Sequence, residues 1–216
     1  MKPLTPSLDT KVRILDAAER IFADRGFDAT SLRMITTEAN VNLAAVNYHF
    51  QSKEALLHAV YARRAGPVNA RRLELLNTYE GAEDELQVES ILDAFVRPMV
   101  DDAEACVFIP RLMIRLLYLD AKETSRSVFQ AQFQPVVQRF HEAFRRALPH
   151  LSEKELFMRI QFFLGALANA MAASRNLYAL SREELAQTPL DTMRGLIQFA
   201  AAGMKAPALE ETPCGS

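Results

Sequence analysis

The 216-residue sequence contains no tryptophan, seven glycines and only two cysteines. Cys106 and Cys214 are too few for a disulfide framework and cannot by themselves form a structural zinc site. The longest nearly unbroken apolar run, residues 162–173, is shorter than the roughly 20 residues that span a bilayer. The N-terminal residues lack the apolar core of a secretory signal. These absences predict a cytoplasmic protein that does not enter a membrane.

The charge of the chain is unevenly distributed, although the formal net charge is only −2. Residues 1–65 carry 9 Lys+Arg and 7 Asp+Glu, which gives a net charge of +2, and the remainder carries a net charge of −4. Arg71 and Arg72 bring the N-terminal part to +4. The overall charge therefore does not argue for or against nucleic-acid binding, whereas its distribution favours such binding at the N-terminal end.

Apolar residues recur at helical spacing along nearly the whole chain, and no alternating strand pattern or hairpin signal is found. The first stripe lies in residues 11–25, where Asp9 or Thr10 can cap the helix and Gly26 can end it. Further stripes cover residues 91–100, 129–148 and 190–204. The sequence predicts an all-α fold.

Residues 27–53 predict two short helices joined by a tight turn. Thr30 or Ser31 can cap the first helix, which ends near Ala39. Asn40 tolerates a left-handed conformation and Asn42 can cap the second helix, residues 43–50. The residues expected to face the core are Ala39, Val41, Val46 and Phe50. Those expected to face outward are Leu43, Ala44, Asn47 and Tyr48, with Ala45 and His49 to the sides. This spacing, over residues 31–50, is that of a helix-turn-helix motif.

The outward side chains of the second helix suit contact with DNA. Small side chains at positions 44 and 45 allow close approach to base edges, and Asn47 has the amide that pairs with adenine. Asn42 lies at the helix N-terminus, where free N–H groups favour a phosphate. Polar groups suited to phosphates follow at Tyr48, His49 and Lys53. Paired short helices also occur in proteins that bind no DNA, so geometry alone leaves both interpretations open.

A longer pattern extends on both sides of this motif, over residues 11–61. Its members are Ile14 to Phe22 (ILDAAERIF), Gly26, Phe27, Thr30, Ser31, Ile35, Ala39, Val41, Asn47 to Phe50 (NYHF), and Ser52 to Leu57 (SKEALL). The pattern resembles that of the TetR family of transcriptional repressors. The resemblance implies a sequence-specific DNA-binding regulator that acts as a homodimer on a pseudo-palindromic operator.

The resemblance also implies a domain organisation and a set of DNA contacts. A three-helix helix-turn-helix domain would cover residues 9–55, a helical-bundle ligand-binding and dimerisation domain residues 56–204, and loose tails residues 1–8 and 205–216. The positions implied to contact phosphates are Thr30, Ser31, Arg33, Tyr48, His49 and Lys53. The implied recognition-helix positions are Asn42, Leu43, Ala44, Ala45 and Asn47.

The C-terminal part shows no catalytic signature. It has no Gly-rich phosphate loop, Gly-x-Ser-x-Gly or His-Glu-x-x-His sequence, and the four histidines are scattered. We therefore expect no enzyme activity, no cofactor and no metal. Two alternatives are a helical interaction protein that does not bind DNA and a helical enzyme whose site has no recognisable motif.

An apolar segment with two arginines suggests a pocket for a small effector. Arg111 and Arg115 are four residues apart and share a helix face, where they could meet an anionic head group. The alternative is ordinary core beside a basic face that pairs with Asp101, Asp102 or Glu104. The predicted ligand contacts are Phe108, Arg111, Leu112, Arg115, Phe140, Phe144 and Phe163. Residues 43–50 and 201–204 also resemble a TetR subset that controls fatty-acid metabolism, which implies a fatty acid or acyl-CoA as the ligand.

Two C-terminal segments, residues 153–178 and 184–204, predict a dimer interface. The first is apolar on most sides, and a helix of that kind must be buried on most sides. Gly165 and several alanines permit close helix approach, as in a symmetric four-helix interface. The whole sequence then predicts a dimeric repressor that a small apolar or acyl ligand releases from its operator by a population shift.

Overall fold

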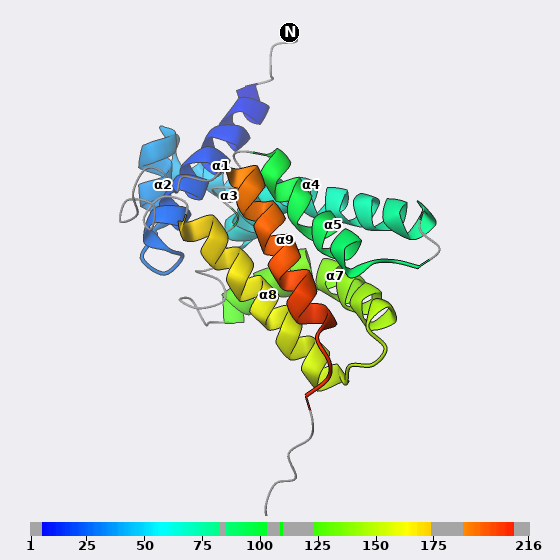
Figure 1. The fold of residues 1–216 in the computed structure, drawn as a ribbon. Coiled ribbons are helices and arrows are strands. Elements are labelled where there is room, and N and C mark those ends of the chain that lie inside the picture. Colours follow the sequence, from blue (N-terminus) through cyan, green and yellow to red (C-terminus); the bar gives the residue numbers. More distant parts are fainter. Residues whose placement is uncertain (1–5, 83–84, 103–108, 110–122, 174–187, 210–216) are drawn as a thin grey trace, which may run out of the picture. The chain divides into compact units, whose positions relative to one another are not determined.

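The computed structural model describes residues 6–82, 85–102, 109, 123–173 and 188–209 (Figure 1). Its helices are α1 (Pro6–Arg25), α2 (Leu32–Ala39), α3 (Leu43–Phe50), α4 (Lys53–Ala82), α5 (Val88–Asp101), α7 (Glu123–Ala147), α8 (Glu153–Ala173) and α9 (Pro189–Lys205). These residues form helices and connections without a strand, which confirms the all-α prediction. Within them, no helix combines the length and apolar character that crossing a membrane requires.

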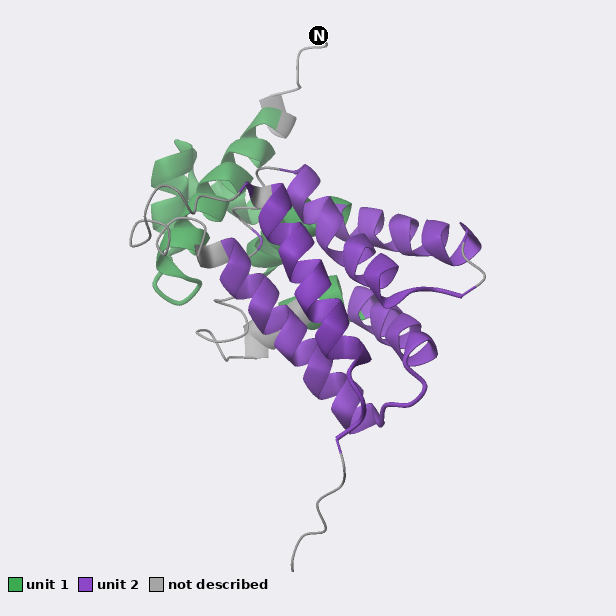
Figure 2. Ribbon diagram, viewed as in Figure 1, with its two compact units in different colours: residues 1–67, 111–134 green, residues 68–110, 135–216 purple. Residues whose placement is uncertain are grey.

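The chain divides into two compact units (Figure 2). Unit 1 comprises residues 1–67 and 111–134, and unit 2 comprises residues 68–110 and 135–216. The division falls inside α4, at Pro67, a residue that cannot donate the usual helical hydrogen bond. Because α4 is continuous from Lys53, the backbone shows no break between residues 55 and 56, and the predicted domain boundary there remains a prediction.

Unit 1 is built on the apolar face of α1. Ile14, Ala17 and Phe22 are buried there, as their helical spacing predicts. Gly26 follows the helix with a φ of 82°, a left-handed conformation that favours glycine. The start of α1 differs from the prediction, because the helix begins at Pro6 and not at a cap provided by Asp9 or Thr10. Residues 6–8 therefore do not belong to a loose tail.

Unit 2 packs α9 against both α5 and α8. Ile91 and Leu92 of α5, Leu156 of α8 and Met204 of α9 are among its most buried side chains. Phe95 contributes an aromatic cluster, with its ring 5.1 Å from that of Phe140 and 5.7 Å from that of Phe163, both edge to face. Such pairs add to the stability that apolar burial provides.

Arg159 of α8 holds the end of α9 and the residues that follow. Its guanidinium donates hydrogen bonds to four carbonyl oxygens, at 3.0, 2.8, 2.6 and 2.7 Å, and pairs with Glu155. The four carbonyls belong to Gly203, Met204, Ala206 and Pro207. Burial opposes ionisation of Glu155, but hydrogen bonds from the Leu209 amide and from Arg159 hold the pKa of this carboxyl below its usual value. Residues 206–209 are thus tied to α8, which corrects the prediction of a loose tail from residue 205.

Arg72 of α4 places a positive charge inside unit 2. The residue is only 3% exposed. The Nε atom donates to the Phe95 carbonyl at 2.7 Å, Nη1 donates to Asn69 Oδ1 at 3.0 Å, and the guanidinium lies 3.9 Å from the Phe95 ring centroid. Among the described residues no carboxylate pairs with it. Burial therefore lowers the pKa of Arg72 from its ordinary value to about 9.

This lowered pKa gives a test based on the pH dependence of stability. Below pH 9 both the folded and the unfolded chain carry the Arg72 proton, and the full cost of burying the charge is present. Above about pH 9 the folded chain loses this proton while the unfolded chain, whose arginine has its ordinary and higher pKa, keeps it, so the free energy of unfolding rises with pH. The variant Arg72→Met lacks this group.

We expect Arg72→Met to be at least as stable as the parent at neutral pH, because an apolar side chain carries no buried charge. From about pH 8 to pH 10.5 the parent should gain stability relative to the variant, by about 1 kcal/mol per pH unit above its folded pKa. Urea unfolding followed by circular dichroism measures both profiles. If the free energies of unfolding of the parent and of Arg72→Met changed with pH in the same way across this range, the result would contradict the burial of the Arg72 charge.

Candidate nucleic-acid interface

Local side-chain bonds fix the two helices of the predicted helix-turn-helix motif. The Ser31 hydroxyl accepts from the Met34 amide at 3.2 Å and caps α2, and Asn42 Oδ1 accepts from the Ala45 amide at 2.8 Å and caps α3. Asn40 between them has a φ of 50°, in the left-handed region. The structure thus confirms Asn40 and Asn42 in their predicted roles and selects Ser31 over Thr30 as the cap of α2.

The two faces of α3 also follow the predicted pattern. Val46 and Phe50 are buried, together with Ala39 of α2, while Val41 is half-buried. On the opposite side Leu43 is 45% exposed and Tyr48 is 79% exposed. Ala44 and Asn47 are exposed as well, and Ala45 and His49 are half-buried at the edges. α3 therefore presents an outward face, defined here as Leu43, Ala44, Asn47 and Tyr48.

Arg13 of α1 holds the turn of the motif in place. Its Nη2 donates to the Ala39 carbonyl at 2.6 Å and to the Asn40 carbonyl at 2.7 Å. These carbonyls end α2, where a positive charge also suits the helix dipole. This role of Arg13 is not among those predicted from the sequence. The signal available in the sequence was a cation next to Ile14, on the buried side of an otherwise apolar stripe. The structure shows that α1 fixes the position from which α3 begins.

Thr30 and Lys53 are predicted phosphate contacts that already have partners within unit 1. The buried Thr30 hydroxyl donates to the Gly26 carbonyl at 2.6 Å. Lys53 Nζ donates at 2.8 Å to the carbonyls of Phe27 and Thr30, and lies 4.1 Å from the Phe27 ring centroid. These bonds shape the loop before α2. An ammonium has three donors, so two of the three N–H groups of Lys53 are engaged in these bonds.

Ion pairs within unit 1 reduce the positive charge that is left for a nucleic acid. Arg20 pairs with Glu38 at 2.9 Å, and Arg63 and Arg64 share Glu19. Arg33 on α2 is exposed and has no carboxylate partner among the described residues. Arg72 is buried in unit 2. Counting its charge with the N-terminal part therefore overstates the positive charge that this part exposes at its surface.

The predicted effector contacts fall into two groups. Phe108, Arg111, Leu112 and Arg115 lie outside the described residues. Phe140, Phe144 and Phe163 are buried in unit 2, the first and last beside Phe95, where their rings form part of a packed core. In the described part of the chain, no three His, Cys, Asp or Glu side chains lie together as metal ligands would.

The sequence matches two family models. Residues 14–60 match the model described as bacterial regulatory proteins, tetR family. Residues 93–203 match the model of the tetracyclin repressor-like C-terminal domain. The first match contains α2 and α3, and the second covers most of unit 2.

Individual relatives are similar over part of the chain. The chain is 38% identical over 56 residues to the HTH-type transcriptional regulator UidR of Escherichia coli K12, covering 26% of this chain and 29% of that protein. It is 30% identical over 97 residues to the HTH-type nicotine-responsive transcriptional repressor HdnoR of Paenarthrobacter nicotinovorans, covering 44% of this chain and 48% of that one. The matches thus span less than half the length of these relatives.

The fold is similar over nearly the whole chain to that of solved regulators. One is the fatty acid degradation regulator FadR from Bacillus halodurans, with a TM-score of 0.62 and 15% identity, covering 94% of this chain and 99% of that one. At this identity the likeness concerns the fold alone. Because the C-terminal model by itself matches more than half of the sequence, and the N-terminal model contains the capped helix-turn-helix, the chain belongs to the TetR family of bacterial regulatory proteins.

Proposed function

We propose that this TetR-family regulator binds a pseudo-palindromic operator as a homodimer, with α3 of each protomer in a major groove, and represses transcription. The observation that carries the proposal is the outward face of α3, which is exposed on a helix capped by Asn42 and preceded by a turn that Arg13 holds. Ala44 and Leu43 offer methyl groups to thymine, and the Asn47 amide offers a donor and an acceptor to adenine.

Phosphate contacts would surround this face. Arg33 on α2 is exposed and has no described carboxylate partner, and the Tyr48 hydroxyl lies on a residue of α3 that is 79% exposed. His49, Ser31 and the third N–H of Lys53 complete the proposed set. Such contacts fix the position of a protein on DNA without reading its sequence.

Two substitutions should separate base reading from phosphate contact. Asn47→Ala should weaken operator binding by about 1–3 kcal/mol and relax base preference at one position. Arg33→Ala should weaken binding to all sequences and lower the salt slope by about 1. Fluorescence anisotropy at several salt concentrations measures both, on operator DNA located by genome-wide footprinting.

Matched controls for this test lie in unit 2. Gln138→Ala and Arg145→Ala remove the same chemical groups from exposed positions of α7 and should leave operator binding unchanged. If Asn47→Ala and Arg33→Ala bind like the parent while remaining helical, the proposed contacts are wrong. If the parent protects no site in the genome, the proposed function itself is wrong.

The homodimer is proposed to form through the exposed faces of α8 and α9. Phe157 and Phe162 of α8 are 60% and 66% exposed, and Phe199 of α9 is 72% exposed. Such large exposed apolar side chains are what a partner surface would cover. Gly165 and Gly195 have open space where a Cβ would lie, so the protomer does not itself require glycine there. In the dimer, a partner helix packed closely against these two positions would leave no room for a side chain and would therefore require glycine. Residues 174–178 and 184–187 of the predicted interface lie outside the described residues.

The dimer proposal predicts that Phe199→Glu and Phe162→Glu, each made alone, produce monomers. Two-fold symmetry places each substitution in the interface twice, so we expect the dissociation constant to rise at least about hundredfold. Light scattering after size-exclusion chromatography measures the mass. The control Val137→Glu introduces the same charge at a partly exposed apolar position of α7 and should remain dimeric. A parent protein that is monomeric, or variants that dimerise normally, would contradict the proposal.

A small apolar or acyl effector is proposed to bind the C-terminal domain, residues 56–204, and to release the operator. The similar regulator HdnoR is described as nicotine-responsive, which supports a small-molecule effector for this chain as well. Among the predicted contacts, Phe108 and Leu112 would supply apolar walls. Arg111 and Arg115 would bind the anionic head group of the ligand. The ligand would favour a spacing of the two α3 helices that does not fit successive major grooves.

The effector proposal predicts that oleate or oleoyl-CoA weakens operator binding by about 5–150-fold, the usual range of such coupling. The measurement is operator affinity of the parent with and without each compound, together with direct titration of the compound in the absence of DNA. Unchanged operator affinity with both compounds would exclude the acyl ligand and leave the DNA-binding proposal intact.

A further inference from the structure

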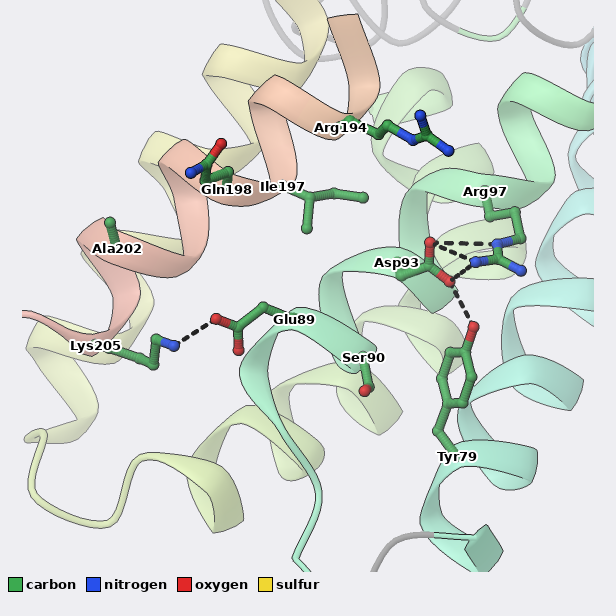
Figure 3. A pocket seen from close by; sticks show the side chains of 10 residues that line it. All are labelled: Tyr79, Glu89, Ser90, Asp93, Arg97, Arg194, Ile197, Gln198, Ala202 and Lys205. Carbon is green, nitrogen blue, oxygen red and sulfur yellow. Dashed lines mark hydrogen bonds and ion pairs between the residues drawn. The ribbon is translucent and has the colours of Figure 1, made fainter. Parts of the chain in front are cut away.

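Unit 2 contains an open groove of about 610 Å³ between α5 and α9, closed at one end by Tyr79 of α4 (Figure 3). Its polar side chains come from both helices: Asp93 and Arg97 from α5, and Arg194, Gln198 and Lys205 from α9. The volume lies in the range of small-molecule sites. The predicted effector contacts that the structure describes, Phe140, Phe144 and Phe163, do not line this groove.

The carboxylates of the groove are already neutralised by neighbours within it. Glu89 forms an ion pair with Lys205, and the hydrogen bond from Lys205 lowers the pKa of Glu89. Asp93 accepts from the Tyr79 hydroxyl at 2.6 Å and pairs with Arg97 at 2.9 Å, and its hydrogen bond raises the pKa of Arg97. Figure 3 shows these contacts as two separate groups along the groove. Neither carboxylate is left to attract a cation.

Arg194 carries the positive charge that remains in the groove. It is exposed, and no described carboxylate lies within ion-pair distance of it. Gln198 lies four residues further along α9, so its side chain is on the same side of the helix as that of Arg194. Ile197 lines the groove between them (Figure 3). A guanidinium, an amide and an apolar side chain thus line one stretch of the groove.

We propose that this groove binds a small organic monocarboxylate with an apolar body. The planar guanidinium of Arg194 matches a carboxylate in two parallel hydrogen bonds. Ile197 and Ala202 provide apolar contact for the body, and Gln198 provides a further hydrogen bond. Lys205 and Arg97 are already paired with Glu89 and Asp93, so Arg194 offers a single unpaired positive charge among the described residues of the groove, which matches a monoanion better than a polyphosphate.

The groove and the proposed dimer surface use different sides of α9. Arg194, Gln198 and Lys205 are spaced by four and seven residues and form one stripe. Phe199 follows Gln198 directly, so its side chain points about 100° away around the helix. A partner that covers Phe199 therefore leaves Arg194 accessible. The groove site depends neither on the proposed DNA binding nor on the proposed acyl effector.

Direct titration of the full chain with 4-phenylbutyrate, without DNA, tests the site. Isothermal titration calorimetry should show saturable binding to the parent, and Arg194→Gln should weaken it at least about tenfold through loss of the charge-assisted pair. The neutral analogue 4-phenyl-1-butanol, which has the same apolar body, should bind far more weakly than the acid.

The matched control is Arg145→Gln, which removes one exposed arginine from α7 outside the groove. It should bind 4-phenylbutyrate like the parent. Three results would overturn the proposal: no binding to the parent, equal binding to Arg194→Gln and the parent, or equal binding of the acid and the alcohol. Because DNA is absent from this titration, a failure here is distinguishable from a failure of operator binding.

Discussion

Each α-helix ends in carbonyl groups that have no partner within the helix, and a chain built from helices meets this constraint at each connection. Here long cationic side chains from neighbouring helices satisfy it. Arg13 of α1 reaches the carbonyls that end α2, and Arg159 of α8 reaches those at and beyond the end of α9. Lys53 does the same for the loop before α2. The start of the recognition helix and the course of the chain after α9 both follow from these bonds, because each would otherwise leave polar groups unpaired.

The same bonds change how much of the positive charge of the N-terminal part is available to a nucleic acid. Counted along the sequence, the N-terminal part is basic, but several of its cations already bind carbonyls or carboxylates within unit 1. Arg72 is removed from the surface altogether, and its lowered pKa reflects burial without a carboxylate partner. The charge that remains for a phosphate backbone is therefore smaller than the sequence count, and Arg33 carries part of it within the motif. A DNA-binding surface of this kind depends on where its cations lie more than on how many the sequence contains.

Helix α9 shows how one element can serve several purposes. Met193, Leu196 and Met204 are buried and attach it to the bundle. Phe199 lies on a second side, proposed for dimerisation, and Arg194 on a third, proposed for an anion. The helical period of 3.6 residues separates these stripes around a single axis. The buried stripe was predictable from spacing alone. The groove was not, because it requires α5 to lie alongside α9, and the two helices are separated by α7 and α8 in the sequence.

The sequence by itself determined the helical class, the bounds of α3, the left-handed turn at Asn40 and the outward face of the recognition helix. These features depend on local preferences, caps and helical periodicity, which act over a few residues. Tertiary structure alone decided that Arg13 and Lys53 hold the motif, that Arg72 is buried, and that residues 206–209 are tied to α8. It also placed Arg194 in a groove without a carboxylate partner among the described residues. The physical reason is that the carbonyl partners of Arg13, Lys53, Arg72 and Arg159 lie between 23 and 48 residues away along the chain, so no local pattern records them.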